Sequence, residues 1–190
     1  FIVSLIPDIV ACDENIMPPE EKQKTTLSEV SLLYFPTGGG KTEAFLGVLV
    51  FNLFFDRFRG KDCGVTSILR YPLRLLSVQQ VQRLANTLAQ AELLRRATPL
   101  ISDTEEFSLG YFVGDANTPN TIGRDRAIRY RGMTQEEIDE ERIIDICPFC
   151  GQPTVHLRFN EETYRLMHFC TNPVCESGEA LPVYMVDSEI

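Results

Sequence analysis

The sequence predicts an α/β fold in which helices cover a parallel sheet, and a small cysteine-bearing module follows. Two observations predict the sheet: short apolar runs alternate with longer segments of helical character, and a glycine loop separates the first run from its helix. A third observation predicts the module, because four of the six cysteines form two close pairs late in the chain. With 190 residues, the chain is long enough for one domain and an appendage.

The first predicted unit is a strand, a glycine loop and a helix. Residues 30–35 are a short apolar run that a proline and three glycines interrupt, which is typical of a buried strand before a hard turn. Residues 42–58 are apolar on nearly every face and contain no proline, so they favour a core helix. Residues 1–29 are predicted to form an N-terminal segment and linker, because residues 13–29 are polar.

A second unit of strand, loop and helix follows the first. We predict a strand over Gly64–Tyr71, a loop at Pro72–Arg74 and a helix from about Ser77 to Arg96. A third strand is predicted at Leu109–Val113. Strands that alternate with helices imply a parallel sheet with helices on its faces. Apolar residues recur at helical spacing along the second helix, namely Val81, Leu84, Ala85, Leu88 and Ala91.

The chain becomes polar before the cysteines. Residues 121–146 are expected to form a charged linker with a short helix, because Thr134–Glu137 fits a capping box. A solvated surface is the favoured interpretation of the arginine and acidic runs in this linker. Residues 147–176 hold the cysteine module. Residues 177–190 are expected to be a linker or a strand, near Leu181–Val186, that returns to the sheet.

The glycine loop has the composition of a phosphate-binding loop. Adjacent glycines let several backbone N–H groups and the N-terminus of the following helix converge on an anion. Lys41 would reach the β- and γ-phosphates, and the Thr42 hydroxyl would ligate Mg²⁺. The strict phosphate-loop pattern asks for a glycine where the chain has Phe35, and the alternative interpretation is a glycine turn that binds nothing. The candidate nucleotide-binding residues are Thr37, Gly38, Gly39, Gly40, Lys41, Thr42 and Glu43, with Lys41 and Thr42 as the catalytic candidates.

The two cysteine pairs have the spacing of metal-binding knuckles. Cys147 and Cys150 form a C-x₂-C pair, and Cys170 and Cys175 form a C-x₄-C pair. Two such knuckles supply four thiolates for one tetrahedral Zn²⁺. The segment between them is predicted to form a hairpin, which gives a zinc-ribbon-like module. Because four cysteines leave no position for a catalytic water, we expect a closed structural site.

Alternatives to a four-cysteine zinc site remain open. They are a redox-active C-x-x-C pair, disulfides, and the replacement of one cysteine ligand by His168. We favour His156 and His168 as ordinary hairpin residues. Cys12 and Cys63 are most simply free thiols.

Charge and hydropathy exclude several classes of protein. The formal net charge of −9 excludes a polycation that coats nucleic acid, so any such contact must be local. The first residues lack the basic start of a signal peptide, and the longest apolar stretch, Phe45–Phe55, is too short to span a bilayer. We therefore expect a cytoplasmic piece of a larger protein that has no membrane partner.

Three segments together resemble a known family. Residues 36–42 have the Pro-Thr-Gly-x-Gly-Lys-Thr form used by superfamily 2 helicases, and residues 68–80 resemble helicase motif Ia, except that Leu73 stands where threonine is common. Residues 114–120 come where such helicases place a glycine loop. With the late cysteine pairs, the combination is similar to the helicase subunit of the bacterial DISARM anti-phage system.

The resemblance implies an incomplete first motor lobe. Residues 30–120 would be a RecA-like P-loop core, with the zinc module inserted before the Walker B strand. The cofactors would be ATP, Mg²⁺ and Zn²⁺, and the partners would be DNA or RNA backbone, the remaining helicase lobes and other defence-system subunits. The nucleic-acid contacts implied are Arg74, Gln79, Gly114 and Asn117.

The sequence departs from that family in its later motifs. No DEAH-type motif is evident, because Ser188 separates Asp187 from Glu189, and we expect the true motif beyond Ile190. The full-length protein would be an ATP hydrolase and helicase in antiviral defence, whereas this fragment alone would be inactive or very weak. The alternative is a zinc-bearing module that binds nucleic acid or protein and has a vestigial phosphate loop. Another P-loop enzyme, such as a kinase or GTPase, is disfavoured.

Overall fold

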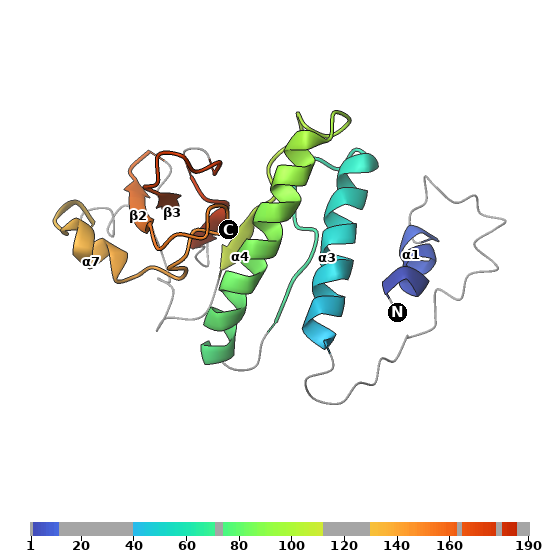
Figure 1. Cartoon of the computed structure of the whole chain (residues 1–190), viewed down its shortest axis with the longest axis horizontal. Helices are drawn as coiled ribbons and strands as arrows, with labels where there is room; N and C mark the ends of the chain where they lie inside the picture. The colour runs from blue at the N-terminus through green and yellow to red at the C-terminus, as the bar shows by residue number, and fades with distance from the viewer. Residues whose placement is uncertain are drawn as a thin grey trace. The chain divides into compact units, whose positions relative to one another are not determined.

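A computed structural model describes residues 2–11, 40–70, 74–111, 130–162, 165–177 and 180–185. The chain divides into two compact units, residues 1–52 and 53–190, and the division falls within one helix. Figure 1 shows the elements in their order along the chain, coloured from blue to red. They are α1 (Ile2–Ala11), α3 (Lys41–Phe58), α4 (Arg74–Ala97), β1 (Leu109–Tyr111), α7 (Gln135–Asp139), β2 (Val155–Asn160), β3 (Arg165–Cys170) and β4 (Val183–Met185).

Both long helices form where the sequence predicts them. α3 begins directly after Gly40, and α4 begins at Arg74, earlier than the expected start near Ser77. Arg74 is therefore the first residue of a helix rather than the last residue of a loop. The apolar stripe predicted along α4 is confirmed, because all of its members are buried: Val81, Leu84, Ala85, Leu88 and Ala91. Neither these helices nor any other described helix is long and apolar enough to cross a membrane.

The described strands form one mixed sheet with the order β1-β4-β3-β2. β1 and β4 run parallel, whereas β3 is antiparallel to both β4 and β2. The described sheet is therefore mixed and not purely parallel as predicted: β1 and β4 pair in parallel, and the other two of its three pairings are antiparallel. The cause is the predicted hairpin, which forms as β2 and β3 but joins the sheet through β4 instead of standing apart. Hairpin strands joined by a short tip are necessarily antiparallel. The returning strand expected at Leu181–Val186 is present as β4.

The strand predicted over Gly64–Tyr71 is not formed within the described residues Gly64–Arg70. Val65 and Ile68 are 72% and 88% exposed there. A strand needs a neighbour to accept and donate its backbone hydrogen bonds, and the described part of the chain provides none for this segment. Its apolar, β-branched composition alone is not sufficient.

α7 covers the outer edge of the sheet at β2. The capping box predicted at its start is confirmed, because Thr134 and Glu137 exchange side-chain and backbone hydrogen bonds. Asp139 accepts a hydrogen bond from the Leu157 N–H at 2.7 Å, and the Gln135 side chain donates to the Leu157 carbonyl at 2.8 Å. Side chains of α7 thus occupy both backbone hydrogen-bonding groups of Leu157 on the edge of β2, which prevents another strand from pairing at this position.

One apolar cluster lies between the sheet and α4. It includes Val81 and Ala85 from the helix and Leu157, Leu166 and Val183 from three strands. A cysteine, Cys147, belongs to the same cluster. The candidate metal ligands therefore lie at the margin of the main core.

Candidate metal centre

Four cysteine sulfurs converge at one end of the hairpin. The sulfurs of Cys147, Cys150, Cys170 and Cys175 all lie within 4.8 Å of one another. Contacts join the two knuckles, since Cys147 Sγ is 3.5 Å from Cys175 Sγ and Cys150 Sγ is 3.8 Å from Cys170 Sγ. All four are free thiols. The two predicted knuckles are thus brought together as one cluster that can hold a metal ion.

The sulfur separations match the chemistry of zinc. Thiolates bind Zn²⁺ at about 2.3 Å, so a regular tetrahedron of four has sulfurs roughly 3.8 Å apart. The 3.5 Å and 3.8 Å contacts are close to this value. A disulfide would need sulfurs at about 2.05 Å. The arrangement therefore fits a four-coordinate ion with small adjustments of the side chains.

The first knuckle is closed by a tight backbone turn. Gly151 has φ of +70°, a left-handed conformation that side chains other than glycine rarely adopt. Its N–H donates to the Cys147 carbonyl at 2.8 Å, and the Cys147 N–H donates to the Gln152 carbonyl at 2.9 Å. The glycine after the second cysteine thus lets the chain fold back so that both sulfurs point the same way.

An asparagine organises the second knuckle. The Asn172 carbonyl accepts a hydrogen bond from the Cys175 N–H at 3.1 Å, and its side-chain oxygen accepts one from the Val174 N–H at 3.3 Å. Asparagine often makes such local bonds to its own turn, and the following Pro173 favours the same bend. Asn172 was not among the predicted site residues, although an asparagine before proline inside a knuckle is a visible signal in the sequence.

Burial and local hydrogen bonds shift the pKa values of the buried Cys147 and the half-buried Cys150 in opposite directions. Burial raises the pKa of the Cys147 thiol and outweighs the nearby backbone N–H groups. Partial burial also raises the pKa of Cys150, but hydrogen bonds from the Asn172 side chain and the Gln152 backbone outweigh it and lower that pKa to about 6. Thr154 Oγ1 lies 3.1 Å from Cys170 Sγ. No sequence pattern indicated this contact by Thr154.

His168 is a buried structural residue and not a member of the cluster. Its Nε2 accepts a hydrogen bond from the Ile143 N–H at 3.3 Å, so the proton lies on Nδ1, which donates to the Val183 carbonyl at 2.9 Å. Burial lowers its pKa to about 4, which keeps the ring neutral. His156 instead pairs through Nδ1 with Asp139 at 2.6 Å. The preference for both histidines as hairpin residues agrees with these contacts.

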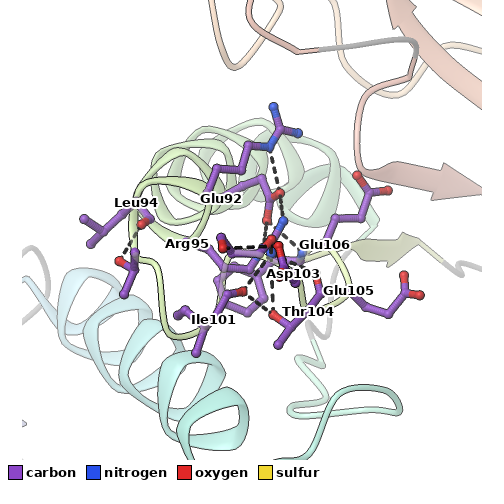
Figure 2. Close-up of polar contacts among 12 residues, drawn as sticks. Glu92, Leu94, Arg95, Ile101, Asp103, Thr104, Glu105 and Glu106 are labelled. Atoms are coloured by element: carbon purple, nitrogen blue, oxygen red, sulfur yellow. Dashed lines mark hydrogen bonds and ion pairs between the residues drawn. The ribbon is translucent and has the colours of Figure 1, made fainter.

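A second polar centre lies near the end of α4, and we call it the Glu92 clamp: Glu92, Arg95, Arg96 and the turn Ile101–Phe107. Figure 2 shows the Glu92 carboxylate and the Arg95 side chain directed toward each other. Arg95 donates to both carboxylate oxygens, at 2.8 Å from Nε and 2.7 Å from Nη2. Its Nη1 also reaches three carbonyls in the turn, those of Ile101, Ser102 and Thr104.

The described part of the phosphate loop ends at the start of a long helix, as expected. Gly40 has φ of +77°, and its carbonyl accepts the hydrogen bond of the Ala44 N–H at 3.1 Å. Lys41 is the first residue of α3 and is exposed, and Thr42 is half-buried. The candidates Thr37, Gly38 and Gly39 lie outside the described residues.

Of the predicted nucleic-acid contacts, Arg74 and Gln79 lie in the first turns of α4. Gly114 and Asn117 lie outside the described residues, as do Asp187 and Glu189. Among the predicted site residues that it describes, the structure brings only the four cysteines together from separate parts of the chain.

Comparisons with known proteins point in one direction. No protein-family model matches the chain, and no solved structure matches it. Among curated proteins, the chain is similar to the DISARM protein DrmA of Bacillus paralicheniformis, with 37% identity over 180 residues. This match covers 85% of the chain but only 16% of that protein. Over most of its length, the chain therefore resembles a small segment of a much longer DISARM protein.

Proposed function

We propose that this chain is part of the first motor lobe of an ATP-dependent DNA helicase or translocase that acts in anti-phage defence. The observation that carries the proposal is the Pro-Thr-Gly-Gly-Gly-Lys-Thr loop, which ends at the N-terminus of an 18-residue helix. Similarity to a DISARM protein supports the defence context. The domain limits proposed above, with a RecA-like core over residues 30–120, belong to this proposal.

The nucleotide would bind at the start of α3. The first N–H groups of an α-helix have no partner within the helix and point out of its end, where they favour an anion. Glycine at position 40 provides the left-handed turn that leads the chain into this end. Lys41 would neutralise the β- and γ-phosphates, and the Thr42 hydroxyl would hold Mg²⁺. ATP with Mg²⁺ supplies the phosphoryl group whose transfer drives movement.

The cysteine cluster would hold one structural Zn²⁺. Four sulfurs at tetrahedral separations satisfy the coordination of zinc and leave no open position. Nucleic-acid backbone would lie against the N-terminus of α4, where Arg74 and Gln79 offer donors suited to phosphate. Gly114 and Asn117 are proposed to lie near the same nucleic-acid strand. The remaining lobes and other subunits of the defence system would complete the motor.

The test compares variants of Lys41 and Thr42 in a longer protein that contains this segment. Lys41→Ala and Thr42→Ala should reduce nucleic-acid-stimulated ATP hydrolysis at least 100-fold, because each removes a ligand of the transferred group or its metal. Thr42→Ser is the matched control, since it keeps the hydroxyl and should retain most activity. ATP hydrolysis that survives Lys41→Ala, or that nucleic acid does not stimulate, would contradict the proposal.

A second function is favoured by the cysteine cluster alone. In that case the chain is a zinc-bearing module that binds nucleic acid or protein, and the phosphate loop is vestigial. Titration of the chain with a fluorescent ATP analogue separates the two functions. The motor proposal predicts binding that needs Mg²⁺ and is lost in Lys41→Ala, whereas the binding-module function predicts no Mg²⁺-dependent binding.

A further inference from the structure

Gln82 joins α4 to the residue before the first metal-ligand candidate. Its side-chain Nε2 donates to the Ile146 carbonyl at 2.9 Å, and its Oε1 accepts from the Ile146 N–H at 3.3 Å. The amide thus pairs with both backbone groups of one residue, as a neighbouring strand would. Gln82 Nε2 also donates to Asn86 Oδ1 at 2.9 Å, which holds the amide in this orientation. Ile146 directly precedes Cys147.

Arg96 joins the other end of α4 to both knuckles. Its Nη1 donates to the Glu176 carbonyl at 3.0 Å, next to Cys175. Its guanidinium carbon lies 5.7 Å from the ring centre of Phe149, which stands inside the first knuckle. On the helix side, its Nε donates to Glu92 at 2.9 Å. Arg96 therefore links the Glu92 clamp to residues that flank the cysteines.

These two attachments define the position of the helix. Gln82 and Arg96 are nearly four turns apart, so they lie on one face of α4 and about 21 Å apart along its axis. Between them, Val81 and Ala85 pack in the same apolar cluster as Cys147. Two separated polar contacts with apolar packing fix both the location of a helix and its rotation about its own axis. Contacts with the residues around the cysteines thus hold α4 in place.

The residues that Gln82 and Arg96 contact are adjacent to a cysteine of the cluster or lie inside a knuckle: Ile146, Phe149 and Glu176. A metal ion that holds four sulfurs fixes these neighbours as well, because structural metal sites order the short loops that carry their ligands. A bound metal ion would therefore also fix the position of α4. The first turns of this helix carry Arg74 and Gln79.

We propose that Gln82 and Arg96 are positioning residues that couple metal occupancy of the four cysteines to the affinity of the α4 N-terminus for nucleic-acid backbone. This inference rests on the proposed function, since it assumes that Arg74 and Gln79 contact nucleic acid. The metal centre then regulates nucleic-acid binding at a distance and touches no nucleotide itself. Such couplings between two sites change affinity by about 5- to 150-fold.

The test measures binding of a fluorescent DNA oligonucleotide to the full chain loaded with zinc. A Gln82→Ala/Arg96→Ala double variant should retain about one zinc per chain and bind the oligonucleotide at least fivefold more weakly. Loading with Co²⁺ gives an independent check, because an intact four-thiolate site keeps its visible absorption spectrum. Gln90→Ala, which removes an exposed amide from the same helix, is the matched control and should bind as the wild type does.

The second arm removes the metal with a chelator. Wild-type affinity should fall at least fivefold, whereas the double variant should change less than twofold, because it already lacks the two polar contacts through which the module positions α4. Unchanged affinity in the zinc-loaded double variant, or an equal effect of chelation on both proteins, would overturn this inference alone. A zinc-loaded wild type that binds no nucleic acid would overturn the proposed nucleic-acid contact and this inference with it.

Discussion

The Glu92 clamp lies at the C-terminal end of α4, and Arg96 joins this end to residues that flank the cysteine cluster, but the two centres differ in what completes them. In the clamp, a buried carboxylate meets a buried guanidinium through two hydrogen bonds, and the remaining N–H groups of Arg95 reach backbone carbonyls. Opposite charges are both supplied by the chain. In the cysteine cluster, all four converging groups are thiols that become anions when they ionise.

The two centres therefore differ in whether they depend on something outside the chain. A buried ion pair with satisfied hydrogen bonds is complete in itself. Four sulfurs at mutual distances below 4.8 Å carry no compensating cation among themselves. Either they stay protonated and make weak contacts, or a cation replaces the protons and binds all four. We therefore expect the Glu92–Arg95 ion pair to form without metal and the cysteine cluster to depend on it.

The largest effect is expected from Cys147→Ser. Loss of one thiolate from a four-cysteine site should reduce bound zinc from about one per chain to nearly none, and structural zinc contributes roughly 10–16 kcal/mol in isolated zinc-finger peptides. Metal analysis and thermal unfolding with and without chelator measure both effects. Cys63→Ser is the matched control, because Cys63 is exposed and lies outside the cluster. Retention of a full equivalent of zinc by Cys147→Ser would contradict the four-ligand assignment.

A smaller but substantial effect is expected when the clamp loses its cation. Arg95→Met leaves the Glu92 carboxylate buried beside fewer donors, and breaking a buried ion pair costs about 3–5 kcal/mol. Urea unfolding at constant zinc should show this loss. The double variant Glu92→Met/Arg95→Met should recover part of it, since both charges are then gone. If zinc content fell along with stability in Arg95→Met, the clamp would not be independent of the metal.

His168 provides a test of which residues support the cysteine cluster. It lies two residues before Cys170 on β3 and is buried. His168→Leu leaves the Ile143 N–H and the Val183 carbonyl without their partner, and an orphaned buried polar group costs roughly 1–3 kcal/mol. Bound zinc should remain the same as in the wild type. A variant that loses zinc while its folded structure persists would show that the histidine supports a ligand instead.

Local patterns in the sequence predicted that the four cysteines would lie together. The two cysteine pairs, the hairpin between them and the Thr134 capping box each depend on residues a few positions apart. Interactions of this range are set by short stretches of chain. The apolar stripe of α4 is likewise visible as a period of helical turns, and every predicted member is buried.

Contacts between distant segments could not be predicted in the same way. Val65 and Ile68 have the composition of a strand, but composition does not provide a pairing partner. The antiparallel addition of the hairpin to β4 depends on which edge is free in three dimensions. Glu92 and Arg95 show the spacing of a helical ion pair, yet only the fold reveals that both are buried.

The smallest effect distinguishes the two centres by pH. Burial raises the pKa of Glu92, but the hydrogen bonds from Arg95, the Phe107 N–H and Arg96 outweigh it, so the pKa is lowered overall. A carboxyl whose pKa is lower in the folded chain stabilises the fold above its unfolded pKa, about 4.3, and this contribution is lost as the pH falls through the folded value. Glu92→Gln removes the charge, and its amide nitrogen cannot accept the hydrogen bonds that a carboxylate oxygen accepts, so the variant should be less stable than the wild type at neutral pH.

That deficit should shrink as the pH falls below about 4.3, because the unfolded chain then takes up a proton at this carboxyl, and it should be smallest below the lower pKa of the folded chain. Acid also releases metal from thiolates, but it does so in both proteins, so the difference between wild type and Glu92→Gln isolates the clamp. Urea unfolding from pH 7 to pH 3 measures this difference. Glu136→Gln, at an exposed position in α7, serves as the control and should show no such trend. A deficit that stayed constant over this range would mean that the charge of Glu92 does not stabilise the clamp. Side-chain packing would then be what distinguishes the clamp from the cysteine cluster.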